Sequence, residues 1–310
     1  MKVIQGLNLL GEIERPYCVT IGNFDGVHVG HRKIITELAR RSQKYGGQSI
    51  VITFDPHPRK VLNPERPLQL MTSMEHRLEL FRQLGVDGVV ILKFDHEFSM
   101  IRAQSFIEKM LFPALKFREL IVGQNYVFGK DREGNIGLLE ILSRKLNFKI
   151  DFVESAVVGG QLVSSSLIRR LISEGSLDQA ADFLGRPFSS FGKVVKGDGI
   201  GSQLGFKTAN IDTDGTLLPP RGVYAVEVVM KNEKLFGIAN VGTRPTFDSR
   251  QSSEKLEVHL LNFDRKIYGD AMEVTFVEMV RDERRFESTE SLRQQIQSDV
   301  DNVREKFLTA

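Results

Sequence analysis

Two histidines three residues apart, His28 and His31, are the side chains of this sequence best suited to work on an anionic substrate. They lie in a glycine-rich stretch, residues 22–31, between an apolar run and a sequence with helical periodicity. At the start of a helix, residues three apart share a face, and the free backbone N–H groups attract phosphate. The stretch predicts a phosphate site, the alternative being a glycine-rich turn with incidental histidines. Its expected phosphate-binding residues are Gly22, Asn23, Phe24, Asp25 and Gly30.

Polar side chains further along the first half suit the same purpose. Three serines and Arg169 stand where a helix is expected to begin, and they would either cradle a polyphosphate or merely cap the helix. Asn125 follows a predicted strand, where it would bind a ligand or stabilise a turn. His57, between two prolines, either shapes a turn or contacts a ligand, and we assign it no chemistry. The three serines are Ser164, Ser165 and Ser166.

A second glycine-rich loop lies in the second half of the chain and ends in Thr208 and Asn210. Four glycines within nine residues favour a loop that folds over phosphates. The Gly-Lys-Ser/Thr ending of a Walker loop is missing, and a flexible hairpin is the simpler interpretation of the loop alone. The glycines are Gly197, Gly199, Gly201 and Gly205.

A strand-like segment, residues 256–260 (LEVHL), carries two polar side chains among three apolar ones. Because side chains alternate across a strand, Glu257 and His259 share the face opposite to the leucines. That face is either part of a site or ordinary solvent-exposed surface, which is the usual place for glutamate.

The elements that position these residues alternate through the first half. Apolar strands alternating with helices predict a parallel sheet covered by helices on both faces, with ligands at the carboxyl ends of its strands. Ser73 is placed to cap one of the helices. Strands are predicted at residues 17–22, 49–54, 86–94, 120–123 and 149–153, and helices at 29–45, 74–84, 98–111 and 136–146.

The pattern changes after two short helices within residues 166–184. Successive strands separated by turn residues predict a small antiparallel β-barrel, closed by a C-terminal helix with one apolar stripe from Leu292 to Phe307. The predicted domains are residues 1–186 and 187–310. The strands of the second are expected at 191–196, 222–230, 234–241, 255–263 and 272–280.

Composition excludes several classes of protein. The 310 residues are 41% hydrophobic, which is too apolar for global disorder, and no run approaches the ~20 apolar residues of a membrane span. A single cysteine, Cys18, excludes an internal disulfide framework and is expected in the core. The formal charge of +2 points to neither nucleic acid nor membrane as a partner. No secretory signal is recognised, so the expected compartment is the cytoplasm. His76 and His96 are expected at the surface.

The first half resembles the nucleotidyltransferase superfamily that carries a His-x-Gly-His motif. The closest match is the adenylyltransferase half of the bacterial bifunctional riboflavin kinase/FAD synthetases. Residues 22–31 (GNFDGVHVGH) carry the resemblance, and further segments follow in the family's order: 53–58 (TFDPHP), 122–129 (VGQNYVFG) and 164–169 (SSSLIR). The second half resembles riboflavin kinase in residues 205–210 (GFKTAN), 239–247 (ANVGTRPTF) and 256–260.

The resemblance implies a Rossmann-like nucleotidyltransferase domain that transfers AMP from ATP to FMN, giving FAD and pyrophosphate. It implies that His28, His31, Arg169 and Mg²⁺ neutralise developing charge, and that no covalent enzyme intermediate forms. For the barrel it implies phosphorylation of riboflavin, with Thr208 and Asn210 holding Mg²⁺ and the nucleotide phosphates. Glu257 would be the general base for the ribityl hydroxyl.

The sequence also departs from the family pattern, mainly in the second half. Lys207 replaces the usual proline, which frees a backbone angle beside a metal ligand, and Ser202-Gln203 replaces Arg-Thr. Residues 262–269 are less acidic than usual, and Val127 stands where arginine is common. These departures predict a kinase that is slow or altered in nucleotide preference, with Lys207 partly replacing the lost arginine charge.

Three alternatives remain open at this point. The first is a monofunctional FMN adenylyltransferase with an inactive kinase half, and the second is a flavin-binding sensor without catalysis. The first half alone also permits another adenylyl or cytidylyl acceptor. The sequence gives no indication of oligomeric state.

Overall fold

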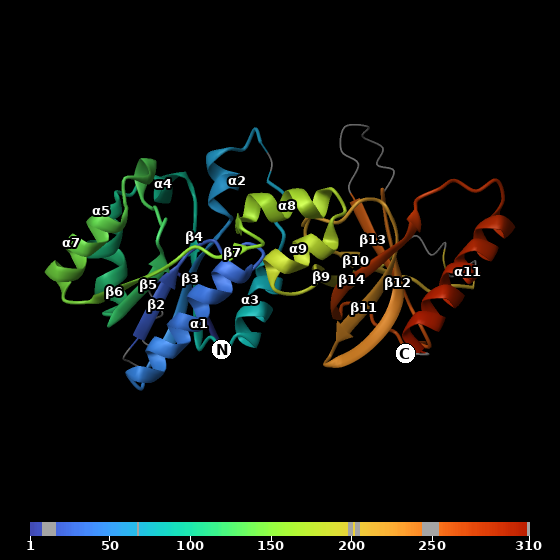
Figure 1. The fold of residues 1–310 in the computed structure, drawn as a ribbon, viewed down its shortest axis with the longest axis horizontal. Coiled ribbons are helices and arrows are strands. Elements are labelled where there is room, and N and C mark those ends of the chain that lie inside the picture. Colours follow the sequence, from blue (N-terminus) through green and yellow to red (C-terminus); the bar gives the residue numbers. More distant parts are fainter. Residues whose placement is uncertain (8–16, 67, 198–200, 202–204, 244–253, 309–310) are drawn as a thin grey trace. The chain divides into compact units, whose positions relative to one another are not determined.

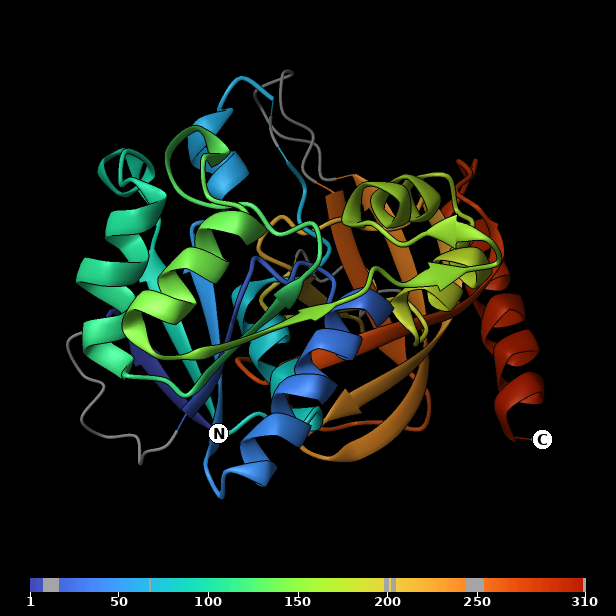
Figure 2. The same ribbon diagram turned by 60° about the vertical axis from the view of Figure 1, so that its left-hand side comes forward.

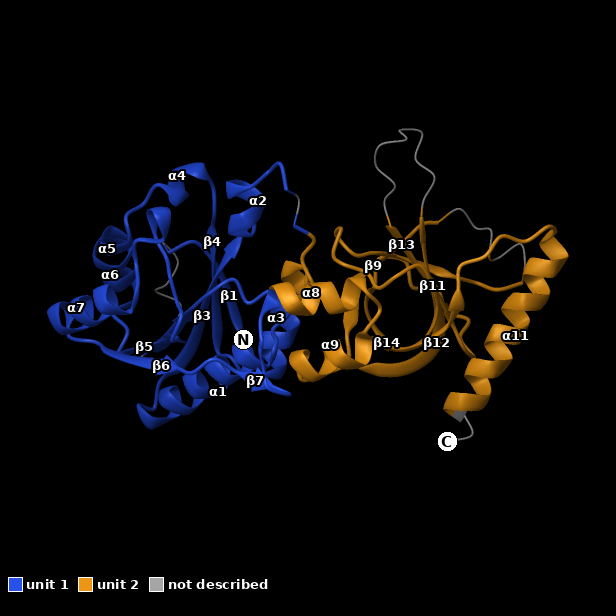
Figure 3. Ribbon diagram, turned by 45° about the horizontal axis from the view of Figure 1, so that its top comes forward, with its two compact units in different colours: residues 1–68, 77–165 blue, residues 69–76, 166–310 orange. Residues whose placement is uncertain are grey.

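The computed structural model describes residues 1–310 except 8–16, 67, 198–200, 202–204, 244–253 and 309–310. The chain folds into two compact units (Figure 3). Unit 1 consists of residues 1–68 and 77–165, and unit 2 of residues 69–76 and 166–310. The two helices after Ser165 therefore cluster with the barrel half, while the domain boundary at residue 186 stays a prediction.

Unit 1 is built on a six-stranded sheet in the order β1-β4-β3-β2-β5-β6, with every neighbouring pair parallel (Figure 1). The strand order reverses at β2, which has β3 on one side and β5 on the other. Ligands of open α/β sheets bind at the carboxyl ends of strands at such a switch point. The strands are β1 (Lys2–Gln5), β2 (Tyr17–Ile21), β3 (Gln48–Asp55), β4 (Gly88–Lys93), β5 (Glu119–Gly123) and β6 (Lys149–Val153).

Helices cover both faces of this sheet, as the alternation of elements predicts. Val19 and Ile21 of β2 join a core cluster with side chains such as Phe106 and Leu139 from segments on one face. Cys18 points to the opposite face, as expected for alternate strand residues, and is buried in the core as predicted. The helices of unit 1, in part or whole, are α1 (Val29–Lys44), α2 (Pro58–Leu62), α3 (Met74–Gln83), α4 (His96–Ser99), α5 (Ala103–Ser105), α6 (Phe112–Leu115) and α7 (Ile136–Leu146).

The helix predicted at residues 98–111 is wrong as a continuous element. Asp95 caps α4, which ends at Ser99. The next helix, α5, begins at Ala103, whose backbone N–H donates to the Glu133 carboxylate at 2.9 Å. Competing caps of this kind are not visible as periodicity. A π-helical segment, η2 (Phe106–Leu111), follows α5, and η3 (Lys130–Arg132) is a 3₁₀ turn. Strand β1, helix α2 and the β7–β8 hairpin (Val157–Val158 and Gln161–Leu162) were also not predicted.

Unit 2 contains the predicted antiparallel barrel, which is closed in the order β10-β13-β12-β11-β14-β9; Figures 2 and 3 show its curved strands. Its interior is lined by alternate, fully buried residues such as Ala239 and Val258. The four-residue strand β10 lies in a segment that we expected to be loop. The elements of unit 2 are α8 (Ser165–Ser173), α9 (Leu177–Leu184), β9 (Ser189–Val195), β10 (Ala209–Asp212), β11 (Gly222–Met230), β12 (Glu233–Thr243), β13 (Glu254–Leu260), β14 (Ala271–Asp282) and α11 (Thr289–Leu308).

Helix α11 is held on the outside of the barrel by an apolar stripe and one buried ion pair. Val300 and Val303 pack in a cluster with Val223 and Ala225 of β11. Beside them, Nε and Nη2 of Arg281 each lie 2.9 Å from the Asp299 carboxylate. Residues 281–286 (RDERRF) form a charged run, and its first residue, Arg281, thus makes a structural contact with α11.

We expect Asp299→Ala to lower the free energy of unfolding by about 3 kcal/mol, because it leaves a largely buried guanidinium without its carboxylate. Asp301→Ala is the matched control on the same helix, because Asp301 is exposed and its ion pair with Arg304 is long, at 3.6 Å. Urea titrations of both variants measure the difference. Equal stabilities would show that the apolar stripe alone holds the helix.

Candidate functional site

The turn between β2 and α1 has an unusual backbone. Phe24 and Val27 have positive φ angles of 52° and 41°, a region that residues with bulky side chains rarely adopt. Strain of this kind persists only where surrounding contacts hold it, and it clusters at functional sites. The turn ends at His28, which is extended and forms the N-cap of α1.

His28 caps α1 with its own side chain. Its Nδ1 accepts the backbone N–H of His31 at 3.3 Å. Because Nδ1 acts as an acceptor, a neutral His28 carries its proton on Nε2 and presents a donor there. The imidazole is buried, with 7% of the residue exposed.

The two imidazoles stack on each other, as their spacing predicts. Their ring centroids lie 3.5 Å apart at an interplanar angle of 16°, and the Phe24 ring meets His31 edge-on at 5.2 Å. A Cβ on Gly30 would lie 3.2 Å from Cε1 of His28. A side chain at position 30 would therefore displace the ring, which explains the glycine between the histidines.

The environment of His31 is unusual for an imidazole. Its Nδ1 is buried and has no hydrogen-bond partner among the described residues. The pKa of His31 is held well below its usual value, mainly by burial and to a smaller extent by His28 and then Arg77. A neutral imidazole with an unsatisfied nitrogen fits phosphate oxygens, whose charge would offset these effects.

The other predicted residues of this site lie in two places. In unit 1, Asp25 is buried, and its backbone carbonyl accepts a hydrogen bond from the Ser165 hydroxyl at 3.4 Å. Asn125, which follows β5, donates to the Ser155 hydroxyl at 3.1 Å. Ser166 and Arg169 belong to α8 within unit 2, and their role, like that of Ser164, stays a prediction.

Sequence reasoning missed Arg77, because a basic residue in a polar helix resembles a surface residue. Arg77 is instead 1% exposed and donates from Nη1 to the Asn23 carbonyl at 2.7 Å. One sequence signal could have indicated its burial: Arg77 stands four residues before Phe81 and so shares a helix face with this fully buried ring.

Two histidines outside the site have structural contacts. His57 caps α2, its Nδ1 accepting the Arg59 N–H at 3.1 Å, which supports the turn-shaping interpretation. The expectation that His76 lies at the surface is wrong: it is 1% exposed and its Nε2 lies 3.2 Å from Glu273 in unit 2. Helix α3 buries one face, and its residue 76 falls on it. His96 is exposed, as expected.

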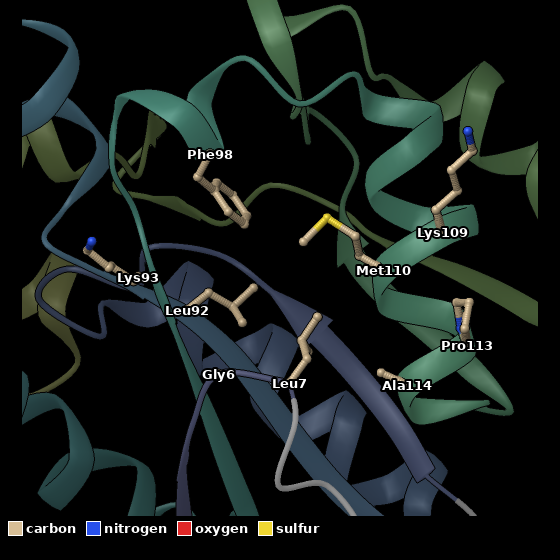
Figure 4. A pocket seen from close by; sticks show the side chains of 9 residues that line it. All are labelled: Gly6, Leu7, Leu92, Lys93, Phe98, Lys109, Met110, Pro113 and Ala114. Carbon is tan, nitrogen blue, oxygen red and sulfur yellow. The ribbon is translucent and has the colours of Figure 1, made fainter.

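A pocket of about 590 Å³ opens at the carboxyl ends of β1 and β4 (Figure 4). Its floor is apolar, with Phe98 and Met110 facing each other across it, and the ammonium groups of Lys93 and Lys109 stand at its sides. This combination suits a ligand with an apolar body and an anionic group. The remaining described lining residues are Gly6, Leu7, Leu92, Pro113 and Ala114.

The second candidate site lies on the outer surface of the barrel, around Asn210. A Cβ on Gly197 would lie 1.9 Å from Nδ2 of Asn210, and one on Gly201 would lie 2.9 Å from the Thr208 hydroxyl. The loop glycines therefore allow the backbone to pass directly over the two predicted metal ligands. Gly199 and Ser202 lie outside the described residues.

Strand register brings the predicted base to the same place. Glu257 of β13 is the direct partner of Asn210 on β10 and of Asn240 on β12, so the three side chains stand side by side on one face. Asn210 is 8% exposed, and its buried Oδ1 has no hydrogen-bond partner among the described residues. Lys255 lies 2.7 Å from the Glu257 carboxylate.

The residue that replaces the family's proline is held by its neighbours. Nδ1 of His259 lies 2.9 Å from the Lys207 carbonyl oxygen, within donating distance, and the Lys207 ammonium pairs with Asp264 at the surface. His259, next but one to Glu257, thus fixes the backbone just before Thr208. Hydrogen bonding here replaces part of the restriction that proline would impose.

Comparison with known proteins assigns both halves of the chain to known families. A family model described as FAD synthetase matches residues 11–167, and one described as riboflavin kinase matches residues 184–307. A bifunctional riboflavin kinase/FMN adenylyltransferase of Escherichia coli K12 is 37% identical, with 99% of this chain and 98% of the relative covered. The relative of the same name from Buchnera aphidicola subsp. Schizaphis graminum is 35% identical, with 99% of both chains covered.

The chain belongs to the bifunctional riboflavin kinase/FMN adenylyltransferase family. The resemblance read from its motifs is thereby confirmed along the whole length. Among solved structures, a macrolide-efflux protein from Streptococcus pneumoniae has a similar fold, with a TM-score of 0.81, 28% identity, and 98% of this chain and 99% of that chain covered. No helix in the described part of this family member is both long and apolar enough to cross a membrane.

The low pKa of His31 makes stability depend on pH. In the unfolded chain its pKa is about 6.5, so acid protonates the unfolded state first, and stability falls as the pH drops below that value. Between pH 7.5 and 5.5 we expect His31→Gln to lose about 1 kcal/mol less of unfolding free energy than the wild type. Denaturant titrations at both pH values measure this, with His96→Gln as the exposed control. Identical losses in all three proteins would contradict a neutral His31.

Proposed function

We propose that this chain phosphorylates riboflavin to FMN at the barrel and then adenylylates FMN to FAD in unit 1. The observation that carries the proposal is the stacked His28–His31 pair, in which the buried Nδ1 of His31 has no hydrogen-bond partner among the residues that the structure describes. The alignment of Asn210 with Glu257 supports the kinase reaction in the same way.

In the adenylyl transfer, an oxygen of the FMN phosphate attacks the α-phosphorus of ATP in line. A bond from that oxygen to the α-phosphorus forms as the bond to the β-phosphate oxygen breaks, and pyrophosphate leaves. Because no covalent enzyme intermediate is needed, catalysis consists of positioning and charge stabilisation. His28 would donate from Nε2 to the α-phosphate, and His31 would bind a phosphate oxygen. Asn125, the three serines and Arg169 are proposed to hold the remaining phosphates.

In the kinase reaction, the ribityl hydroxyl of riboflavin attacks the γ-phosphorus of ATP, and ADP leaves. Glu257 would take the hydroxyl proton as the new bond forms. The strand register favours this role, because Glu257 is the direct cross-strand partner of Asn210.

We propose Mg²⁺ as the divalent ion that accompanies ATP in the kinase reaction. The hydroxyl of Thr208 and the amide oxygen of Asn210 are oxygen donors of the kind this ion prefers. The buried Oδ1, which has no hydrogen-bond partner in the described part of the chain, fits such a ligand. When bound, the ion would offset charge on the phosphate oxygens. Because both reactions consume ATP, the cytoplasm is the compartment we propose.

Alanine in place of both His28 and His31 is expected to lower adenylyl transfer by roughly 10²–10⁴-fold, because two charge-stabilising groups are lost. Incubation with riboflavin, ATP and Mg²⁺, followed by chromatography, should then show FMN accumulating without FAD. His96→Ala is the matched control, an exposed histidine away from both sites. Normal FAD synthesis by the double variant would exclude the assignment.

Glu257→Gln is expected to lower riboflavin phosphorylation by roughly 10²–10⁴-fold, because the amide cannot accept the proton. Conversion of added FMN to FAD should continue at the wild-type rate. Glu233→Gln, an exposed glutamate on β12, is the control. If the wild type converts FMN but not riboflavin, the monofunctional alternative is correct, and if it consumes no ATP with either flavin, the sensor alternative is.

A further inference from the structure

The guanidinium of Arg77 is buried without a direct ion pair among the described residues. It donates to two neutral acceptors, the Asn23 carbonyl at 2.7 Å and the Thr53 hydroxyl at 3.3 Å, and its Nε has no partner. Asp25 and Asp55 are near enough to favour its charge. A buried cation carries a desolvation penalty, and without a carboxylate directly against it the penalty is only partly offset.

Phe81 lies one helical turn beyond Arg77 on α3. It contacts Phe24, the residue that follows Asn23 in the segment between β2 and α1. Its ring meets Phe24 edge-on, with centroids 5.7 Å apart and an interplanar angle of 87°. Phe24 in turn packs edge-on against His31. Arg77 and Phe81 lie four residues apart and so share a helix face, which contacts Asn23 and Phe24 in succession.

We propose that Arg77 is a positioning residue for adenylyl transfer: it fixes the Asn23 carbonyl and, together with Phe81, holds the left-handed Phe24 against His31. The proposal rests on the proposed function of the first site. Without this support, the strained turn can relax, and the imidazoles lose the orientation imposed by the Phe24 edge. A displacement of about 1 Å at a reacting group costs ~10²-fold in rate.

Arg77 also acts on His31 through charge. The cation is one of the groups that hold the pKa of His31 down, after burial and His28. Among the described residues, the charged or titratable groups that act on His31 or on Arg77 are His28, Asp25 and Asp55, besides these two residues themselves. A neutral residue at position 77 removes one cation and should raise the pKa of His31, whereas lysine keeps the charge but loses the planar fork. The two properties of the guanidinium can therefore be separated by substitution.

The test compares Arg77→Met, Arg77→Lys and the control Arg82→Met, an exposed arginine on the same helix. We expect kcat for adenylyl transfer from supplied FMN to fall by roughly 10- to 100-fold in Arg77→Met and less in Arg77→Lys. The acid side of the pH profile should move to higher pH in Arg77→Met only. Riboflavin phosphorylation by the same preparations should stay within about twofold, which controls for folding.

An NMR titration of the imidazole protons gives a readout that needs no activity. The pKa of His31 should rise in Arg77→Met and stay low in Arg77→Lys and Arg82→Met. Unchanged rates and unchanged His31 titration in Arg77→Met would overturn the proposal. Equal losses of both activities would also overturn it, because they indicate a purely structural residue. If Arg77→Met does not fold, the rate and the His31 titration of Arg77→Lys are the test. A wild type without adenylyl transfer but with the expected titration shift would count against the proposed function alone.

Discussion

The close approach of two imidazoles at the first turn of α1 is the constraint on which unit 1 depends. With the rings stacked at 3.5 Å, a Cβ at position 30 would press on the His28 ring at 3.2 Å, and His28 is extended as the helix cap. The chain reaches that cap only through left-handed residues, and these must be held from outside the turn. One such contact comes from the buried guanidinium of Arg77, which donates to the Asn23 carbonyl at 2.7 Å.

The second site is constrained in a different way, by hydrogen-bond register. Asn210, Glu257 and Asn240 come from three strands and meet because each is the direct partner of the next. A slip of one residue in β13 would send the glutamate into the barrel interior and a valine or leucine to the surface. The apolar partners on the inner face, such as Val258, resist that slip because they fill the core.

Much of the fold and of the candidate sites could be predicted from local sequence patterns. The parts that could not be predicted depend on features that a local pattern does not carry. The strands and helices that bury a regular face were found, and so was the proximity of the two histidines, because their signals lie within about ten residues. β10 was missed because four residues carry too little periodicity. Arg77 and His76 were missed because their burial depends on partners far along the chain: 54 residues separate Arg77 from Asn23, and 197 separate His76 from Glu273. Charge in a sequence favours exposure, and only the tertiary structure shows when a partner reverses it.

The barrel also shows how closure and precision are reconciled. Closing six strands into a barrel requires local irregularity, because a regular sheet does not bend enough to meet itself. The register shifts of this barrel lie between β11 and β14, next to Tyr224 and Val226. The pairings of β10 with β13 and of β13 with β12 are uninterrupted across the segments that carry the site. The register shifts are thus separated from the strands that align Glu257 with its amide neighbours, so the barrel closes without disturbing the register of the candidate kinase site.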